Sequence, residues 1–215
     1  MKYYPLYMDL QGRECLVVGA GAVAARKVCT LLDCGARVTV VGERPVEALE
    51  ELRSRGVKIL NRKFRRDDLQ LQALVIGATD SEDVNAAVSK ESRRRGIPVN
   101  IVDDPEKSTF IVPAIFRRGD VTMAVSTGGS SPALARLIRE DLERHYGEEY
   151  ASLAALLGSY RERMMSAVSG HRRRADVWKG ILDAGILDVL RREGVEEAEA
   201  IIRRHIDEAG KRSVS

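Results

Sequence analysis

Two glycines and an alanine stand at the spacing that proteins use to bind the phosphates of a dinucleotide. Gly19, Gly21 and Ala24 follow the apolar run 15–18, and an Ala-rich segment with helical apolar spacing, 23–33, continues from them. In such a strand–turn–helix the first glycine permits a tight turn, the second lets the backbone approach a pyrophosphate, and a small third residue allows close helix–strand packing. The helix would direct its first N–H groups at the phosphates. The pattern predicts dinucleotide binding; the alternative is a tight turn that binds nothing.

Glu43 and Arg44 follow the second expected strand, 37–41, where Rossmann domains usually place an acid for the ribose hydroxyls. Glu43 is the candidate for this contact, whereas Arg44 could instead attract the 2′-phosphate of NADP. The sequence therefore favours NAD over NADP through Glu43 alone. The alternative is that both residues cap the next helix.

Polar residues also follow the fourth and fifth expected strands. Ala78 and Thr79 end the fourth, and Asp103 and Asp104 end the fifth, 97–102. Because ligands of parallel sheets bind outside the carboxyl ends of the strands, these residues should face one crevice. One aspartate there could act as a general base while the other stays structural. The alternative is ordinary turn chemistry of an Asp-Asp-Pro sequence.

Strands and helices that would position these residues alternate along the first half of the chain. The expected strands are 15–18, 37–41, 57–60, 74–78 and 97–102, and the expected helices are 23–33, 45–55 and 81–94. Ser81 is expected to cap the last of these helices. This alternation predicts an α/β fold, a Rossmann-type doubly wound parallel sheet.

From about residue 104 onward the pattern changes. Two apolar runs, 109–116 and 121–125, predict an antiparallel hairpin. Pro132 fits the first position of the next helix, and the remainder has helical spacing, with breaks expected near Gly170, 180–185 and Gly194. The apolar hairpin strands need a partner surface, which predicts a homodimer. The expected domains are an NAD-binding Rossmann domain at 1–112, a dimerisation hairpin-plus-helix region at 113–147 and a helical C-terminal domain at 148–215.

Composition limits the class of protein. The chain has 215 residues, 44% of them hydrophobic, and a formal net charge of +3, so bulk charge gives no argument for nucleic acid. Three cysteines without C-x-x-C spacing predict buried, reduced thiols and a cytoplasmic protein. No signal-peptide core or membrane-spanning run is recognised. No histidine has a carboxylate or a cysteine near it at the sequence spacing of metal ligands, so we expect no fixed metal site.

Five motifs follow one another in a distinctive order. They are Val17–Lys27, Ala78–Asp80 with Asn85, Val99–Pro105, Phe110–Ile115 and Ala124–Pro132. In order and spacing they resemble the precorrin-2 dehydrogenase family, the siroheme-synthase N-terminal module, some members of which are also sirohydrochlorin ferrochelatases. The resemblance covers about residues 3–150 and is far more specific than the glycine turn alone.

The resemblance implies NAD-dependent oxidation of precorrin-2 to sirohydrochlorin by a homodimer. It leaves open whether this chain also takes ferrous iron as a substrate. The family's catalytic aspartate matches Asp103 and not Asp104. Together with the glycine turn and the crevice residues, the candidate cofactor-binding residues are Gly19, Gly21, Ala22, Val23, Glu43, Arg44, Ala78 and Thr79.

Substrate contacts are expected on both sides of the hairpin. Arginine binds carboxylates in forked pairs, and precorrin-2 carries several carboxylates. A serine that the family places near the tetrapyrrole is matched by Thr127, which keeps the hydroxyl. The candidate substrate-binding residues are Asn100, Arg117, Thr127, Gly128 and Arg136, with Arg118 and Arg139 nearby; solvated surface is the alternative for each arginine.

A protein of another class could share the glycine turn. A non-catalytic NAD-sensing regulatory module would bind the dinucleotide without performing a reaction. Such a module has no need for the Asp103 turn or for the glycine pair at 128–129, and this difference favours the enzyme.

Overall fold

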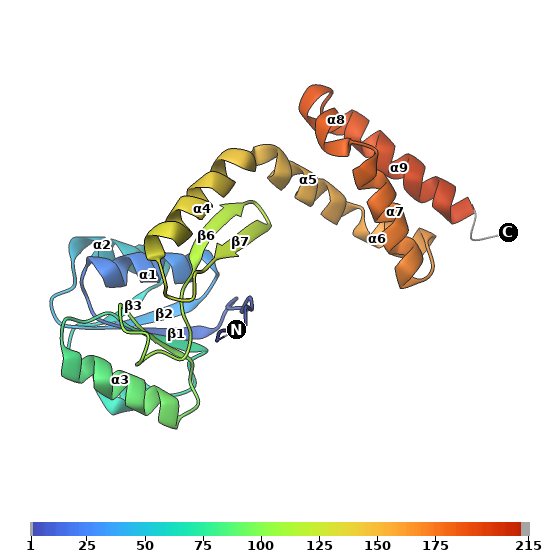
Figure 1. Ribbon diagram of the computed structural model, residues 1–215. Helices are drawn as coiled ribbons and strands as arrows, with labels where there is room; N and C mark the ends of the chain where they lie inside the picture. The colour runs from blue at the N-terminus through green and yellow to red at the C-terminus, as the bar shows by residue number, and fades with distance from the viewer. Residues whose placement is uncertain (1, 212–215) are drawn as a thin grey trace. The chain divides into compact units, whose positions relative to one another are not determined.

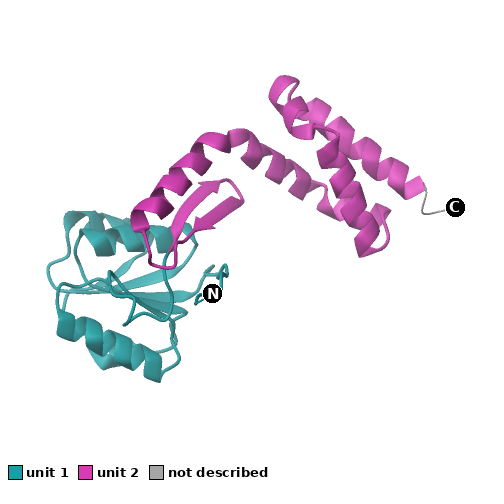
Figure 2. Ribbon diagram, viewed as in Figure 1, with its two compact units in different colours: residues 1–112 teal, residues 113–215 magenta. Residues whose placement is uncertain are grey.

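The computed structural model describes residues 2–211, which divide into two compact units, the first ending at Val112 and the second beginning at Pro113 (Figure 2). Strands and helices alternate in the first unit. Its elements are β1 (Glu14–Val18), α1 (Ala22–Asp33), β2 (Arg37–Val41), α2 (Glu47–Glu51), the 3-10 helix η1 (Leu52–Arg55), β3 (Lys58–Leu60), the 3-10 helix η2 (Arg66–Asp68), β4 (Leu74–Gly77), α3 (Glu82–Arg94) and β5 (Val99–Ile101).

The strands of this unit form one parallel sheet in the order β3-β2-β1-β4-β5. Helices α1 and α2 cover one face and α3 covers the other (Figure 1). The predicted Rossmann-type, doubly wound sheet is confirmed. Its strand order reverses between β1 and β4, and open α/β sheets bind ligands at such a point.

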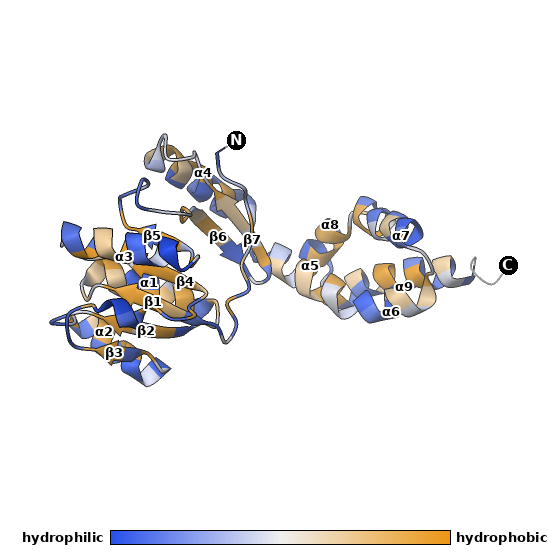
Figure 3. Ribbon diagram, turned by 90° about the horizontal axis from the view of Figure 1, so that it is seen from below, coloured by the Kyte–Doolittle hydropathy of each residue, from blue (hydrophilic) through white to orange (hydrophobic). Residues whose placement is uncertain are grey.

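Strand alternation divides the apolar residues between two cores. Cys15 and Val17 of β1 join the core under α1, while Leu16 and Val18 join the core under α3; each is at most 1% exposed. Because helices cover both faces, β1 is a continuous apolar run and not an alternating one. Strand β1 is accordingly coloured mainly as apolar in Figure 3.

Several expected boundaries and environments differ in the structure. The helix expected at 45–55 is a short α2 followed by η1, which ends at Gly56 with φ +86°. The strand expected from residue 109 begins only at Ala114, after Pro113, which has no N–H for a ladder. Only Cys15 is fully buried; Cys29 is half-buried and Cys34 is exposed at the C-cap of α1. Burial raises the pKa of the Cys15 thiol to about 11, so this thiol stays protonated.

Glu91 ties the segment around η2 to α3. Its carboxylate lies 2.6 Å from guanidinium nitrogens of Arg94 and Arg95, and Arg95 also donates to the carbonyl oxygens of Leu69 and Arg66. The two guanidinium groups lower the pKa of Glu91 from 4.5 to about 2. A carboxyl whose pKa is lower in the folded state stabilises the fold above the unfolded pKa, and this stabilisation is lost as the pH falls through the folded pKa.

We expect Glu91→Gln to lower the free energy of unfolding at neutral pH, with the difference from wild type shrinking as the pH falls from about 4.5 to about 2. Urea unfolding at a series of pH values measures this difference. Glu51→Gln, at an exposed position, serves as the control. A deficit that stays constant over the whole acidic range would contradict the ion-pair account.

The second unit consists of a hairpin followed by helices. Its elements are β6 (Ala114–Arg118), β7 (Val121–Val125), α4 (Pro132–His145), α5 (Glu148–Ser159), α6 (Arg161–Ala167), α7 (His171–Asp183), α8 (Ile186–Arg192) and α9 (Val195–Lys211). The antiparallel pairing of β6 with β7 and the place of Pro132 at the start of α4 confirm the predicted hairpin and helix. Phe116 of β6 is 0% exposed, with the Tyr146 ring centroid 6.3 Å from its own.

The C-terminal helices enclose a core of their own. Fully buried members include Met164 of α6, Ile181 of α7 and Ile202 of α9. The break expected within 180–185 falls at Ala184–Gly185, between α7 and α8. Gly180 itself lies inside α7, where it faces His205 of α9. In the part of the chain that the structure describes, no helix has the length and apolar character to cross a membrane.

Candidate active site

The parallel register brings neighbouring strand ends to one edge of the sheet. Val18 pairs with Val41 on one side and with Gly77 on the other, and Gly77 pairs with Ile101. The register continues beyond the strands, since the N–H of Ala78 donates to the carbonyl O of Val18 over 2.7 Å. The loops that carry the predicted cofactor and catalytic residues of the first unit therefore leave the sheet side by side.

The two glycines of the first turn are needed for different reasons. Gly19 has φ +130°, and a Cβ at this position would overlap the carbonyl O of Ala78. Gly21 has φ −88°, which any residue adopts, and a Cβ there would meet nothing within 4 Å. Gly19 thus lets β1 turn beside β4, whereas Gly21 leaves open space in front of α1. Ala24 is 0% exposed, as close packing at the third position requires.

The N-terminus of α1 fits the pyrophosphate of a dinucleotide. Its N-cap is Gly21, no described side chain caps it, and its first turn carries no acid. The N–H groups that open a helix have no intrahelical acceptor, and the helix dipole adds positive partial charge. Ala22 and Val23 supply such N–H groups beside the open space at Gly21. These residues lie where the predicted cofactor contacts require, and the contacts themselves stay a prediction.

Glu43 and Arg44 are exposed in the loop after β2. Arg44 has φ +55°, and its N–H donates to Oδ1 of Asn61 over 3.2 Å. Val46 is the N-cap residue of α2, and among the described side chains none caps that helix. The alternative that Glu43 and Arg44 cap α2 is therefore wrong, and their cofactor contacts stay a prediction. Asn61, which holds this loop, was not predicted.

The loop after β4 uses its own side chains to close a turn. The Thr79 hydroxyl accepts from the N–H of Ser81 over 3.0 Å, and Nδ2 of Asn85 donates to the carbonyl O of Thr79 over 2.8 Å. Ser81 caps α3 by accepting from Val84 over 3.4 Å, as predicted. Because its hydroxyl is engaged in the turn, Thr79 would contact a cofactor through its backbone.

Asp103 and Asp104 have different environments after β5. The Asp104 carboxylate accepts from the backbone N–H of Lys107 over 3.0 Å and from its Nζ over 2.5 Å, and Lys107 also reaches Glu82 over 2.6 Å. The hydrogen bonds from Lys107 hold the pKa of Asp104 below its ordinary value. Asp104 therefore belongs to the turn.

Asp103 is exposed, and its carboxylate makes no hydrogen bond or ion pair with another described residue. Its backbone is left-handed, with φ +59°. Only a few per cent of non-glycine residues have positive φ, and backbone strain of this kind concentrates at functional sites. The turn thus holds Asp104 and presents Asp103 at the same sheet edge as the glycine turn.

Side chains that follow β5 secure this turn. The Ser108 hydroxyl donates to the carbonyl O of Asp104 over 2.7 Å and accepts from the last N–H of β5 over 2.9 Å. The Thr109 hydroxyl accepts from the first N–H of β5 over 2.8 Å. Asn100, only 9% exposed, donates to the carbonyl O of Phe110 over 3.1 Å. Asn100 therefore helps to hold the loop, and its contact with a substrate stays a prediction.

Lys27 of α1 is a residue that the sequence analysis did not single out. It is half-buried on α1, one turn after Ala24. Burial and the adjacent Arg26 lower the pKa of Lys27, while attraction by Asp103 raises it. Its position three residues after the buried Ala24 was a signal that Lys27 lies toward the sheet-facing side of the helix.

The turn before α4 holds the predicted serine equivalent. Thr127 Oγ1 accepts from the N–H of Ser131 and donates to its carbonyl O, both over 3.0 Å. Gly128 and Gly129 have φ +65° and +96°, and a Cβ on either would meet nothing within 4 Å. The Thr127 hydroxyl is engaged in this turn, so the open backbone at Gly128 is the freer group.

The arginines of the second unit differ in how far they are paired. Arg118 lies 3.1 Å from the Glu148 carboxylate, and Arg139 pairs with two glutamates of its own helix. Arg117 donates through Nε to a carbonyl O two residues further on, over 2.9 Å. Arg136 is exposed and makes no ion pair with a described residue. Of the four, Arg136 is the most available for a carboxylate ligand.

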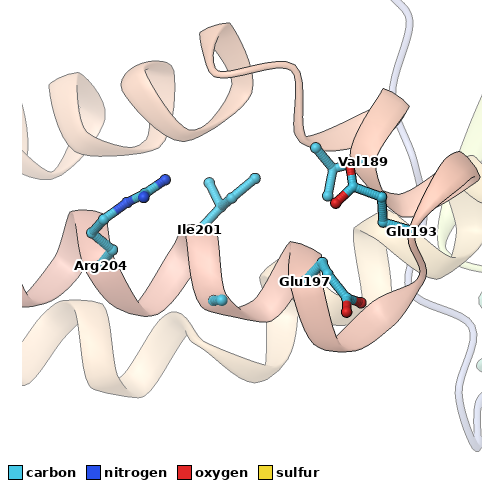
Figure 4. Close-up of a pocket in the computed structure, with 6 residues that line it drawn as sticks. Val189, Glu193, Glu197, Ile201 and Arg204 are labelled. Carbon is cyan, nitrogen blue, oxygen red and sulfur yellow. The ribbon is translucent and has the colours of Figure 1, made fainter.

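A surface depression lies between α8 and α9 (Figure 4). It is lined by Val189, Glu193, Glu197, Ala200, Ile201 and Arg204. None of these residues belongs to the predicted cofactor or substrate set. Over residues 2–211 the structure brings together no group of three histidine, cysteine or acidic residues that could hold a metal ion.

Three family models match successive parts of the chain. One described as "Putative NAD(P)-binding" matches residues 6–114, one for the central part of a sirohaem biosynthesis protein matches 118–145, and one for the sirohaem synthase dimerisation region matches 149–206. The last match lies beyond 113–147, the region to which the sequence reading assigned dimerisation. The fold, the glycine turn and the first match define the class: an NAD(P)-binding Rossmann protein.

Named relatives narrow this class. The chain is 39% identical over 212 residues to a siroheme synthase of Methylococcus capsulatus, covering 98% of this chain and 45% of the relative. It is 39% identical over 207 residues to a siroheme synthase of Pseudomonas aeruginosa, covering 96% and 44%. A solved structure named SirC, precorrin-2 dehydrogenase, aligns with a TM-score of 0.75 and 27% identity over 94% of this chain and 98% of that one.

The chain belongs to the family described by the putative NAD(P)-binding model, and it carries the sirohaem-synthase central and dimerisation segments after that match, in order. It spans less than half the length of the curated siroheme synthases that it matches.

Proposed function

We propose that this protein is an NAD-dependent precorrin-2 dehydrogenase of siroheme biosynthesis. The observation that carries the proposal is Asp103, an exposed carboxylate in a left-handed turn at the same sheet edge as the N-terminus of α1, which no described side chain caps. A dinucleotide-sensing module would need the open helix N-terminus to bind the dinucleotide, but it would not need the Asp103 carboxylate. The likeness to a named precorrin-2 dehydrogenase supports the same activity.

Some residues of the first unit bind NAD, and one residue, Asp103, transfers the proton. Gly21 leaves room for the pyrophosphate, the N–H groups of Ala22 and Val23 bind it, and Glu43 accepts from the ribose hydroxyls. NAD, when bound, supplies an acceptor for the hydride that leaves the substrate. Asp103 takes the hydrogen that leaves as a proton, and the two electrons of that C–H bond form the new double bond.

Substrate recognition is proposed for residues of both units. Arg136 and Arg117 would bind carboxylates of precorrin-2. Gly128 would contact the substrate through its backbone, in the turn that Thr127 lines. Asn100 would orient the tetrapyrrole near Asp103. Iron insertion is not part of the proposal, because no specific observation favours it. Sirohydrochlorin and ferrous iron, offered together, would reveal that activity.

The test of the function is turnover. Purified protein with precorrin-2 and NAD should give the spectrum of sirohydrochlorin, and omission of either reactant should prevent the change. Binding of NAD without any spectral change would favour the sensing module. Tighter binding of NADP than of NAD would overturn only the cofactor preference and would point to Arg44.

We also propose that the protein is a homodimer. Three residues of α4 at helical spacing, Leu134, Leu137 and Ile138, are 40–58% exposed and form one apolar stripe. Ile115 of β6 is 43% exposed as well. A second copy of the chain would bury such a surface, and the match to a dimerisation region supports self-association.

Leu137→Glu should shift the protein from dimer to monomer, because a carboxylate cannot be buried without a partner. The molar mass in solution at micromolar concentration measures the shift. Leu71→Glu, the same substitution at a residue 95% exposed in the first unit, should leave the mass unchanged. A wild-type monomer would rule the dimer out.

A further inference from the structure

We propose that Asn61 is a positioning residue that sets cofactor specificity, because its side-chain oxygen holds the loop after β2 in the shape that favours NAD over NADP. The inference rests on the proposed function, since it acts through Glu43, the proposed partner of the ribose hydroxyls. Asn61 itself lies in the loop after β3, outside the five motifs and outside the predicted cofactor-binding residues.

The sheet places the loop after β3 next to the loop after β2. Val41, the last residue of β2, pairs with Leu60, the last residue of β3, so the two loops leave the sheet as neighbours. Asn61 follows directly, and its Oδ1 accepts from the N–H of Arg44 over 3.2 Å. This hydrogen bond joins a side chain of one loop to the backbone of the other.

The glycine turn holds the loop after β2 from its other side. The N–H of Val46 donates to the carbonyl O of Ala20 over 3.0 Å. A Cβ on Gly42 would overlap the Cβ of Ala20, so the loop begins directly against the turn. Residues 43–45 lie between these two anchors, and the hydrogen bond to the Asn61 side chain holds the middle of this short segment.

The backbone of Arg44 needs such support. It is left-handed, with φ +55°, a conformation that a residue with a side chain adopts only at an energetic cost. The hydrogen bond to Asn61 offsets this cost, because its donor is the N–H of the same residue. Without the acceptor, Arg44 would relax to an ordinary backbone conformation, and the adjacent Glu43 would lose its fixed place.

Glu43 and Arg44 favour different cofactors. The carboxylate of Glu43 would accept hydrogen bonds from the free ribose hydroxyls of NAD and would repel the 2′-phosphate of NADP. Hydrogen bonds require a fixed geometry, whereas attraction between the guanidinium of Arg44 and a phosphate falls off slowly with distance. A loosened loop would therefore weaken the binding of NAD more than that of NADP.

Asn61→Leu tests the inference, because leucine has nearly the same size and no acceptor. We expect NAD affinity to fall about tenfold, the value of about one net hydrogen bond, and NADP affinity to change less than twofold. Calorimetric titration with each cofactor measures both, and retained NADP binding shows that the site is still folded.

Gln72→Leu is the matched control. Oε1 of Gln72 likewise accepts from a backbone N–H, that of Gln70, over 2.7 Å, in the loop that enters β4 at the opposite edge of the sheet. This substitution should leave both affinities unchanged. Equal effects of Gln72→Leu and Asn61→Leu on the ratio of the two affinities would overturn the inference.

The route through the Arg44 backbone has its own readout. Glycine adopts a left-handed backbone at no steric cost, so in the Arg44→Gly background Asn61→Leu should lower NAD affinity less than about threefold. An equal loss in both backgrounds would contradict the proposed route. If wild-type protein prefers NAD and Asn61→Leu keeps that preference, this inference alone fails. If wild-type protein does not oxidise precorrin-2, the proposed function fails, and the two affinities still decide the role of Asn61.

Discussion

Asp103→Asn should slow the oxidation of precorrin-2 by about 10²–10⁴-fold while leaving NAD affinity unchanged, because general-base catalysis is typically worth that much. Asparagine tolerates the left-handed backbone at this position, so the turn should keep its shape. The exposed side chain makes no described hydrogen bond that the substitution would break. Turnover measured alongside NAD binding separates the chemical step from the binding step.

Asp104→Asn is the matched control for this prediction. Its carboxylate closes the turn through Lys107, so the substitution should weaken the turn and lower the melting temperature more than it lowers turnover. A near-normal rate in Asp103→Asn would reduce that residue to a positioning or turn-forming group. Equal loss of rate in both variants would show that the shape of the turn, and not one carboxylate, supports the reaction.

Gly21→Asp should weaken NAD binding at least a hundredfold while leaving the fold intact. The added carboxylate would stand in the open space in front of α1, where it would both fill the place of the pyrophosphate and repel it. The backbone at Gly21 suits any residue, and aspartate is a favourable N-cap residue, so the melting temperature should stay the same or rise slightly. Calorimetric titration with NAD and thermal unfolding measure the two effects.

Gly21→Asn separates bulk from charge, because it has nearly the same size without the charge. It should weaken NAD binding less than Gly21→Asp does. Unchanged NAD affinity in Gly21→Asp would remove the basis for placing the pyrophosphate at α1. A lower melting temperature together with lost binding would indicate a structural cause instead.

The fold could be predicted from sequence because its signals are local. Apolar runs such as 15–18 and 37–41, separated by helical spacing, specify a parallel sheet covered on both faces. Boundaries were less predictable where one pattern continues through a change of structure, as at Leu52, where α2 tightens into η1. The exposure of Cys34 depends on where α1 ends against the sheet, which its sequence alone does not show.

The candidate site could be predicted only in part. The glycine turn was recognised from its own residues, whereas the choice of Asp103 over Asp104 rested on a family resemblance. The structure adds an independent reason, since Lys107 forms an ion pair with Asp104 and not with Asp103. The hydrogen bonds of Thr79 and Thr127 depend on how each loop closes, and a hydroxyl in a sequence does not show whether a backbone group already engages it.

The central claim is that this chain transfers a hydride from precorrin-2 to NAD. The most direct test is to mix wild-type protein with limiting precorrin-2 and excess NAD and to quantify both products by absorbance. The account predicts that NADH and sirohydrochlorin appear in equal amounts and at the same rate, and that Asp103→Asn slows both together. Sirohydrochlorin formed without NADH, or NAD bound with neither product formed, would contradict it.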